Sequence, residues 1–413
     1  MPEISTTRKI LSYALSLIFL YYEMYIQVVP SVIAPDLINQ FGINLYHLGI
    51  ISGFFFITYS AMQIPAGILF DCYSIKKVLS MSVLSCSLGL YLFASTQSYY
   101  ILVVARLIMG LGSAFAFSAT LLIAVNYFPK KYFSFLVGIT QLMACLGAFS
   151  GQEFTSFFLE TYRWDNITYA YAIVGTLLFL CVGFVVPNQV IASDIRQSLL
   201  EVTKSLLLVL KKPCNWLCAI YVFSLWAPMG VFASMWGNSY LQLKYSISSV
   251  ESSMLLGFTW AGLGFGAPLV GYLCRNIYDK RCLLFILALI GIVSLSMILF
   301  VKLDSKLVLS SALVFLGFSS VGQLLTFEYI YANNLKNFIG TAVGFNNMFM
   351  VLSSLTMQPL VGYLLSHPIG HRLDNLDNYN MALSMLLLLY GLALILSLFF
   401  VKQKPKTLTA ETA

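Results

Sequence analysis

Glu23 and Arg106 lie deep inside long apolar stretches of the sequence, where a charged side chain is costly in lipid unless it is paired or faces water. Glu23 lies about 13 residues into the first stretch and Arg106 about eight residues into the fourth, roughly 20 Å and 12 Å along a helix. The two depths coincide if these stretches enter a bilayer from opposite sides. We therefore predict that Glu23 and Arg106 face a central cavity and neutralise each other, directly or through water. Their separation would let Glu23 take up a proton. The alternative interpretation is a structural pair that only locks two helices together.

Other polar and aromatic residues within apolar stretches are candidates for the same cavity. Gln141 and Asn347 each follow a glycine of matching sequence context by three residues, so we expect them to face each other. Amides inside a membrane need hydrogen-bond partners and favour a wet cavity, whereas aromatic rings also serve as packing or interface anchors. The remaining candidates are Tyr22, Tyr25, Gln27, Tyr59, Gln63, Trp226, Trp236, Trp260, Gln323 and Asn346.

The composition indicates that these residues are positioned by membrane-spanning helices. The chain has 413 residues, of which 59% are hydrophobic and 9% charged, and a mean hydropathy of +0.86. These values predict an all-α integral membrane protein. The predicted spans are the twelve stretches near residues 10–34, 46–70, 77–96, 98–126, 132–157, 167–187, 213–240, 249–274, 281–301, 307–331, 338–366 and 379–401.

The distribution of basic residues predicts the orientation. With a cytoplasmic N-terminus, 17 Lys and Arg residues fall on the cytoplasmic side and five on the other, and Arg106 completes the 23. The positive-inside rule therefore predicts that both termini are cytoplasmic. This asymmetry accounts for the net charge of +7 without a nucleic-acid partner.

Internal similarity divides the chain into two halves. We predict a bundle of six helices over residues 1–187, a cytoplasmic linker with an amphipathic segment over 188–212, and a second six-helix bundle with a short tail over 213–413. "FLVGITQ" matches "TAVGFNN", "RLIMGLG" matches "LVFLGFS", and "GILFDCYSIKK" matches "GYLCRNIYDKR". Repeats in the same orientation favour a pseudo-twofold axis along the membrane normal, with a binding site between the bundles.

The stretch "GILFDCYSIKKVL" resembles the loop between helices 2 and 3 of the major facilitator superfamily, and "ARLIMGLGSAFAF" resembles that family's helix 4. The resemblance, to a bacterial type of transporter, implies two bundles that rock to expose a central cavity to either side alternately. It also implies a conformational latch at the cytoplasmic face. The latch residues would be Gly67, Asp71, Lys76 and Lys77. Alternatively, these charges only mark a solvated loop. The family's pattern is altered at Cys72, Ser74 and Ile75, and Arg275 replaces the acid in the second copy.

The function that these features predict is secondary active transport of a small polar organic solute, such as an amino acid, a nucleoside or an organic acid, by proton-coupled import. In this hypothesis Arg106 holds a substrate carboxylate. An exporter of a metabolite, siderophore or drug, working as an antiporter, is the alternative. A non-transporting sensor or scaffold is an alternative of another class.

The sequence has no P-loop and no HExxH motif, and its three His residues fall in predicted loops, so we expect neither an enzyme nor a metal or other cofactor. The eight Cys residues lie mostly in or beside helices, where thiols act as small hydrophobes. The expected partners are the substrate, H+ and the lipid bilayer. We expect a monomer in the plasma (inner) membrane.

Overall fold

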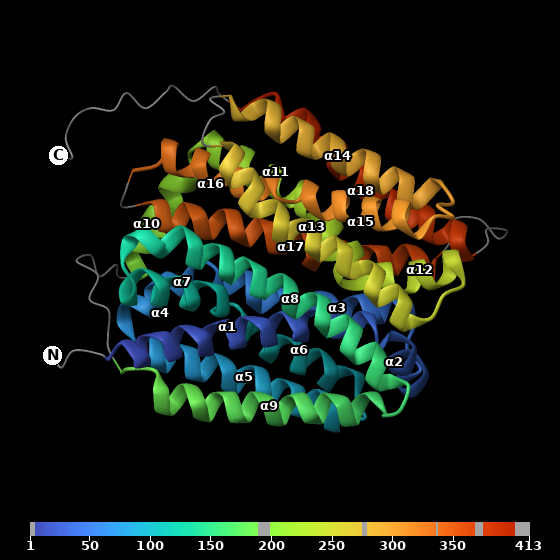
Figure 1. The fold of residues 1–413 in the computed structure, drawn as a ribbon, viewed down its shortest axis with the longest axis horizontal. Helices are drawn as coiled ribbons and strands as arrows, with labels where there is room; N and C mark the ends of the chain where they lie inside the picture. The colour runs from blue at the N-terminus through green and yellow to red at the C-terminus, as the bar shows by residue number, and fades with distance from the viewer. Residues whose placement is uncertain (1–4, 189–198, 275–278, 336–337, 368–374, 401–413) are drawn as a thin grey trace.

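The computed structural model describes residues 5–188, 199–274, 279–335, 338–367 and 375–400. Within these residues the regular structure is helical (Figure 1). The helices of the first half are α1 (Thr6–Val28), α2 (Ala34–Phe41), α3 (Leu45–Met62), α4 (Pro65–Cys72), α5 (Ile75–Ser95), α6 (Tyr99–Ser113), α7 (Ala116–Tyr127), α8 (Phe133–Leu159) and α9 (Trp164–Val185).

The predicted linker contains α10 (Leu199–Leu210), which packs against α11 and α17 of the second half. The segment Met229–Trp236 between α11 and α12 is a π-helix. The other helices of this half are α11 (Pro213–Pro228), α12 (Gly237–Tyr245), α13 (Ser249–Cys274), α14 (Lys280–Phe300), α15 (Lys306–Ser319), α16 (Gly322–Asn333), α17 (Ile339–Ser366) and α18 (Asn375–Ser397).

The prediction of an all-α membrane protein is confirmed. Eleven described helices are long and apolar enough to cross a membrane, and the count reaches twelve when the bent pair Thr6–Ser31 and Ala34–Phe41 is one span. Pro30 and Pro35 lie at this 57° bend, where each lacks the N–H that would continue a helix. Large apolar side chains cover the outside: Phe184 is 81% exposed and Leu388 is 77% exposed. Such residues are suited to lipid contact.

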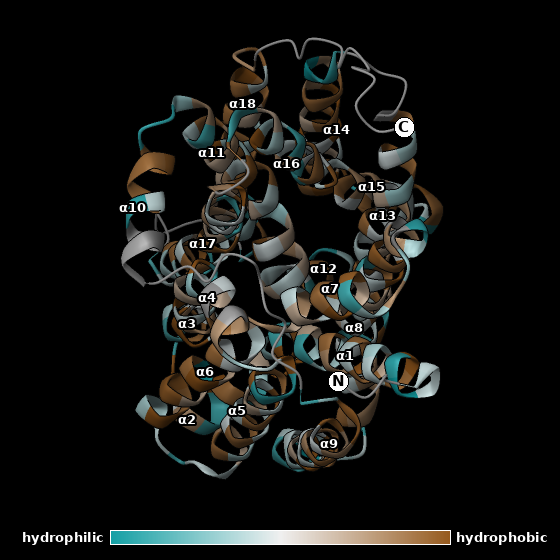
Figure 2. Ribbon diagram, turned by 90° about the vertical axis from the view of Figure 1, so that its left-hand side faces the viewer, coloured by the Kyte–Doolittle hydropathy of each residue, from teal (hydrophilic) through white to brown (hydrophobic). Residues whose placement is uncertain are grey.

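We call the end of the molecule where α1 begins the proximal end, and the end that carries α2 and α12 the distal end (Figure 1). Viewed from the proximal end, α3 lies beside α17 in a largely hydrophobic ribbon (Figure 2). The two halves meet mainly through α3 against α17 and α8 against α13.

Equivalent glycines pack equivalent helices together in the two halves. A methyl group added at Gly110 on α6 would clash with the backbone carbonyl of Phe55 on α3, and one added at Gly317 on α15 would clash with that of Thr259 on α13. The glycines are 207 residues apart and the carbonyls 204 (317 − 110 and 259 − 55). This close approach of backbones, which only glycine permits, is therefore repeated in both bundles.

Candidate functional site: a central cavity between the bundles

A cavity lies between the two halves and receives side chains from both. Its space free of protein atoms is about 970 Å³, part of it open to solvent. In the first half α1, α3, α7 and α8 contribute to its wall, and in the second half α11, α13, α16 and α17.

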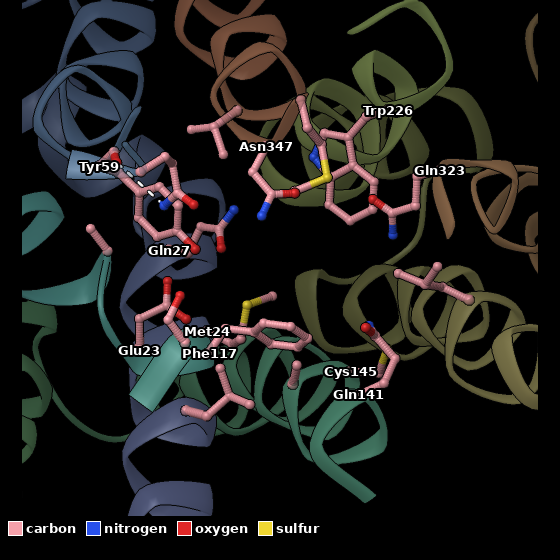
Figure 3. Close-up of a pocket in the computed structure, with 18 of the residues that line it drawn as sticks. Glu23, Met24, Gln27, Tyr59, Phe117, Gln141, Cys145, Trp226, Gln323 and Asn347 are labelled. Atoms are coloured by element: carbon pink, nitrogen blue, oxygen red, sulfur yellow. Dashed lines mark hydrogen bonds between the residues drawn. The ribbon is translucent and has the colours of Figure 1, made fainter. Parts of the chain in front are cut away.

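Nine of the fourteen predicted cavity residues line this space (Figure 3). They comprise one carboxylate, five amides and three aromatic residues. These residues are Glu23, Gln27, Tyr59, Gln63, Gln141, Trp226, Trp260, Gln323 and Asn347.

Glu23 is the one charged residue of the cavity lining. It is 1% exposed, and its Oε1 has no hydrogen-bond partner among the described residues. In Figure 3 its carboxyl group lies on the same side of the cavity as Gln27 and Tyr59. A buried carboxylate without a fixed partner is a strong candidate for reversible protonation or for ligand contact.

Arg106 does not line the cavity. Its Nη1 donates to the carbonyl of Ile26 at 2.8 Å, its Nε donates to that of Ile51 at 3.2 Å, and its guanidinium lies 4.6 Å from the centre of the Phe55 ring. The ion pairs among the described residues do not include one with Glu23. The direct pairing predicted from depth is therefore absent from this conformation, because backbone carbonyls of α1 and α3 hold the guanidinium behind the wall.

Arg106 nevertheless contacts α1 close to Glu23. Ile26, whose carbonyl accepts from Arg106, lies one helical turn after Glu23. The Nη2 of Arg106 is buried without a partner among the described residues, as is the Oε1 of Glu23. Each of the two groups therefore retains an unused hydrogen-bonding atom.

The other four predicted cavity residues have structural contacts outside the lining. Tyr22 donates to the carbonyl of Tyr171 at 3.0 Å, and Tyr25 stacks on the Tyr171 ring with centroids 3.5 Å apart. The indole of Trp236 donates to the carbonyl of Gln358 at 3.2 Å. Asn346 donates to Thr326 at 3.0 Å.

The search for polar residues missed the apolar part of the lining. Leu20 and Met24 lie on α1 at helical spacing from Glu23 and Gln27, so the helical period would have revealed them. Phe117, Cys145 and the other apolar lining residues carry no comparable signal in a sequence that is apolar throughout. They are Phe56, Ala114, Ala144, Leu263, Leu324, Phe327, Met350 and Val351, and Ser118 was missed with them.

The cavity is closed at the distal end by hydrogen bonds between the two halves. The amide of Tyr46 donates to Ser366 at 2.9 Å, and Ser156 contacts Ser253 at 2.6 Å. Gln152 on α8 donates to the carbonyl of Ala233, in the π-helix, at 2.8 Å. All hydrogen bonds between the halves that involve described residues lie near this end.

The predicted latch segment lies at the proximal end. Lys77 contacts the Tyr73 ring, with its Nζ 4.7 Å from the ring centre, and a methyl group at Gly67 would meet no atom within 4 Å. Gly67 therefore makes no close helix contact in this conformation. The side chain of Asp71 lies outside the described part of the structure. With the distal end closed, contacts that would hold the proximal ends together are not expected here, so the latch stays a prediction.

Comparison with known proteins identifies the class. The family model of the Major Facilitator Superfamily matches residues 13–357. The chain belongs to this superfamily of membrane transporters, and neither the family nor its matched relatives are enzymes.

Several of the relatives by sequence are described as transporters of anions. A chloroplastic sodium-dependent phosphate transport protein 1 of Arabidopsis thaliana is 25% identical over 260 residues, which cover 58% of this chain and 50% of that protein. A probable sulfoacetate transporter, SauU, of Cupriavidus necator is 33% identical over 129 residues, or 31% of this chain and 30% of the relative. The matches thus span half or less of these relatives.

Solved structures share the fold over nearly the whole chain. A bacterial homologue of the human lysosomal transporter Spinster, inward-facing and unoccupied, has a TM-score of 0.74 at 15% identity. The match covers 96% of this chain and 97% of the homologue's chain. The nucleoside transporter NupG has a TM-score of 0.71 at 13% identity, with 95% and 98% covered.

Proposed function

We propose that the protein moves a small polar organic solute across the plasma (inner) membrane by alternating access, coupled to protons, as a monomer. The observation that carries the proposal is the cavity between the bundles, with a buried carboxylate and five amides in its lining. Amides at that depth need partners that a polar solute or water would provide. A closed distal end and an opening elsewhere are the arrangement that alternating access requires.

In this proposal Glu23 binds and releases the proton, and Arg106 pairs with Glu23 only when its carboxylate is deprotonated. A protonated Glu23 is neutral and needs no cation, whereas the deprotonated carboxylate would attract the free Nη2 of Arg106 across one helical turn. Rocking of the bundles would change the access of water to Glu23, which lines the cavity between them, and so favour one protonation state. Proton binding would thereby depend on which side the cavity faces.

The proposal includes an orientation with both termini in the cytoplasm. The proximal end then faces the cytoplasm, and the closed distal end faces outward. The structure would correspond to an inward-open state, and the latch residues Gly67, Asp71, Lys76 and Lys77 would come together in the outward-open state.

A transport assay tests the proposal. The full chain is reconstituted in proteoliposomes, and uptake of labelled solutes is measured with and without an inward proton gradient. Gradient-dependent accumulation of any polar solute supports the proposal. Binding without transport in either direction would overturn it in favour of a sensor.

A second candidate is transport of small anions, which is favoured by the similarity to a phosphate transport protein and to a probable sulfoacetate transporter. The same assay with phosphate and sulfoacetate distinguishes it from the first.

A further inference from the structure

The charge of the cavity lining restricts the substrate. The lining residues include no Lys, Arg or His, and Glu23 is the one charged member. Arg106 is 1% exposed and its guanidinium is bound to carbonyls of two helices. An anion that enters this cavity would lose its hydration without gaining a cationic partner, which is strongly unfavourable in a low-dielectric site. A zwitterion would meet the same problem at its carboxylate.

The amides of the lining have hydrogen-bonding capacity that the protein does not use. Among the described hydrogen bonds, the side chains of Gln27, Gln323 and Asn347 make none. The bond from Gln63 to the carbonyl of Tyr59 is 3.5 Å long, at the outer limit for a hydrogen bond. Each amide offers both a donor and an acceptor, which suits a neutral solute with both kinds of group.

Two further atoms in the wall are buried without partners. The indole Nε1 of Trp260 and the Oε1 of Glu23 have no hydrogen-bond partner among the described residues, and both residues are 1% exposed. A buried donor and a buried acceptor that line one cavity are costly unless a ligand or water satisfies them.

Aromatic rings occupy the same wall as these polar groups. Tyr59, Trp226 and Trp260 were expected there, and Phe56, Phe117 and Phe327 join them. Rings combined with amides suit a flat heteroaromatic solute, because the rings can stack on its faces while the amides pair with donors and acceptors on its edge.

We infer that the substrate is an uncharged nucleobase or nucleoside. The inference rests on the proposed transport function and narrows its substrate class. Phosphate, sulfoacetate and zwitterionic amino acids are not expected to be substrates, since each carries a negative group for which the lining has no cation.

The first test compares solutes of different charge on the purified full chain. Uridine, adenosine and cytosine are compared with phosphate, sulfoacetate and serine by thermal stabilisation, because a ligand of the folded state raises Tm. Uptake of the same six solutes into proteoliposomes follows. We expect stabilisation and uptake with one or more of the first three and none with the last three.

The two proposals fail differently in this experiment. Uptake of phosphate, sulfoacetate or serine without any effect of the three neutral solutes would overturn the inference and leave transport standing. If none of the six binds or moves, the inference is overturned, and the proposed function is left without support from solutes of any charge.

A pair of tryptophan variants tests the predicted contact. Trp260→Phe keeps a ring in the wall but removes the indole N–H, so we expect the Kd of the neutral ligand to rise about 3- to 10-fold, the effect of one hydrogen bond. Trp216→Phe is the control, because Trp216 lies on α11 outside the lining and donates to the carbonyl of Leu210. An unchanged Kd in Trp260→Phe, with Tm equal to that of the control, would contradict the contact.

Discussion

The two walls of the cavity differ in charge although their helices pack alike. The first half contributes Glu23, with Arg106 directly behind the wall. The residue of the second half that matches Arg106 is Leu313, at the same distance before its glycine, and it is completely buried. Since leucine fills the equivalent position, the packing of these helices does not require a charge. This comparison favours a functional role for Arg106 over a purely structural one.

The largest effect is expected when this difference is removed by Arg106→Leu. Transport should fall by about 100-fold or more, the effect of roughly 3 kcal/mol from loss of a buried charged contact. The stability should change much less, because the lost bonds to Ile26 and Ile51 are offset by removal of a buried charge. Initial uptake rates and Tm measure the two effects. A full transport rate would show that Arg106 has no part in the mechanism.

Glu23→Gln should separate coupling from translocation. The amide keeps the size of the side chain but cannot release a proton, so accumulation driven by a proton gradient should be lost. Exchange of labelled for unlabelled solute should stay within about threefold of the wild-type rate, a difference of roughly 0.6 kcal/mol. The two modes are measured in the same proteoliposomes. Retained accumulation in the variant would remove Glu23 from the proton pathway.

The helical membrane fold could be predicted from the sequence, because apolar stretches mark the spans and repeated motifs mark the equivalent helices of the two halves. The sequence was less informative about the site. The depths of Glu23 and Arg106 follow from residue counts, but the directions of their side chains depend on how α1, α3 and α6 rotate against one another. The guanidinium is held by the backbone carbonyls of Ile26 and Ile51. Every residue of a helix has such a carbonyl, so the sequence does not show which ones will accept a hydrogen bond from Arg106. Depth alone therefore could not distinguish an ion pair from two separate buried groups.

Gln152 and Gln358 form a matched pair of glutamines near the closed distal end, 206 residues apart in the sequence (358 − 152). Both donate to carbonyls of the π-helix, Gln152 across the halves to Ala233 and Gln358 within the second half to Gly230. Loss of one such bond is worth about 1 kcal/mol, so Gln152→Leu should shift the equilibrium about fivefold toward the distal-open state. Gln358→Leu should lower stability by a similar amount without this shift.

Spin labels at Tyr100 and Leu307 report this shift, because both residues are exposed and begin equivalent helices, α6 and α15, at the distal end. The cysteines that are exposed among the described residues, Cys72, Cys181 and Cys282, are first replaced by serine. A larger population of long distances in Gln152→Leu than in Gln358→Leu is expected. Identical distributions would mean that the bond to Ala233 does not hold the distal end closed.

The smallest effect is expected for Gly67→Ala in the predicted latch. The added methyl group meets open space, so the stability of this conformation should stay equal or rise by up to about 1 kcal/mol from the higher helix propensity of alanine. Gly110→Ala is the contrast, because its methyl group would clash with the Phe55 carbonyl and should cost about 1–3 kcal/mol. If Gly67 approaches the opposite bundle only when the proximal end closes, Gly67→Ala should slow transport by a few fold while Tm is unchanged. A wild-type rate would mean that this glycine needs no close approach in either state, and the latch would then depend on its charged residues alone.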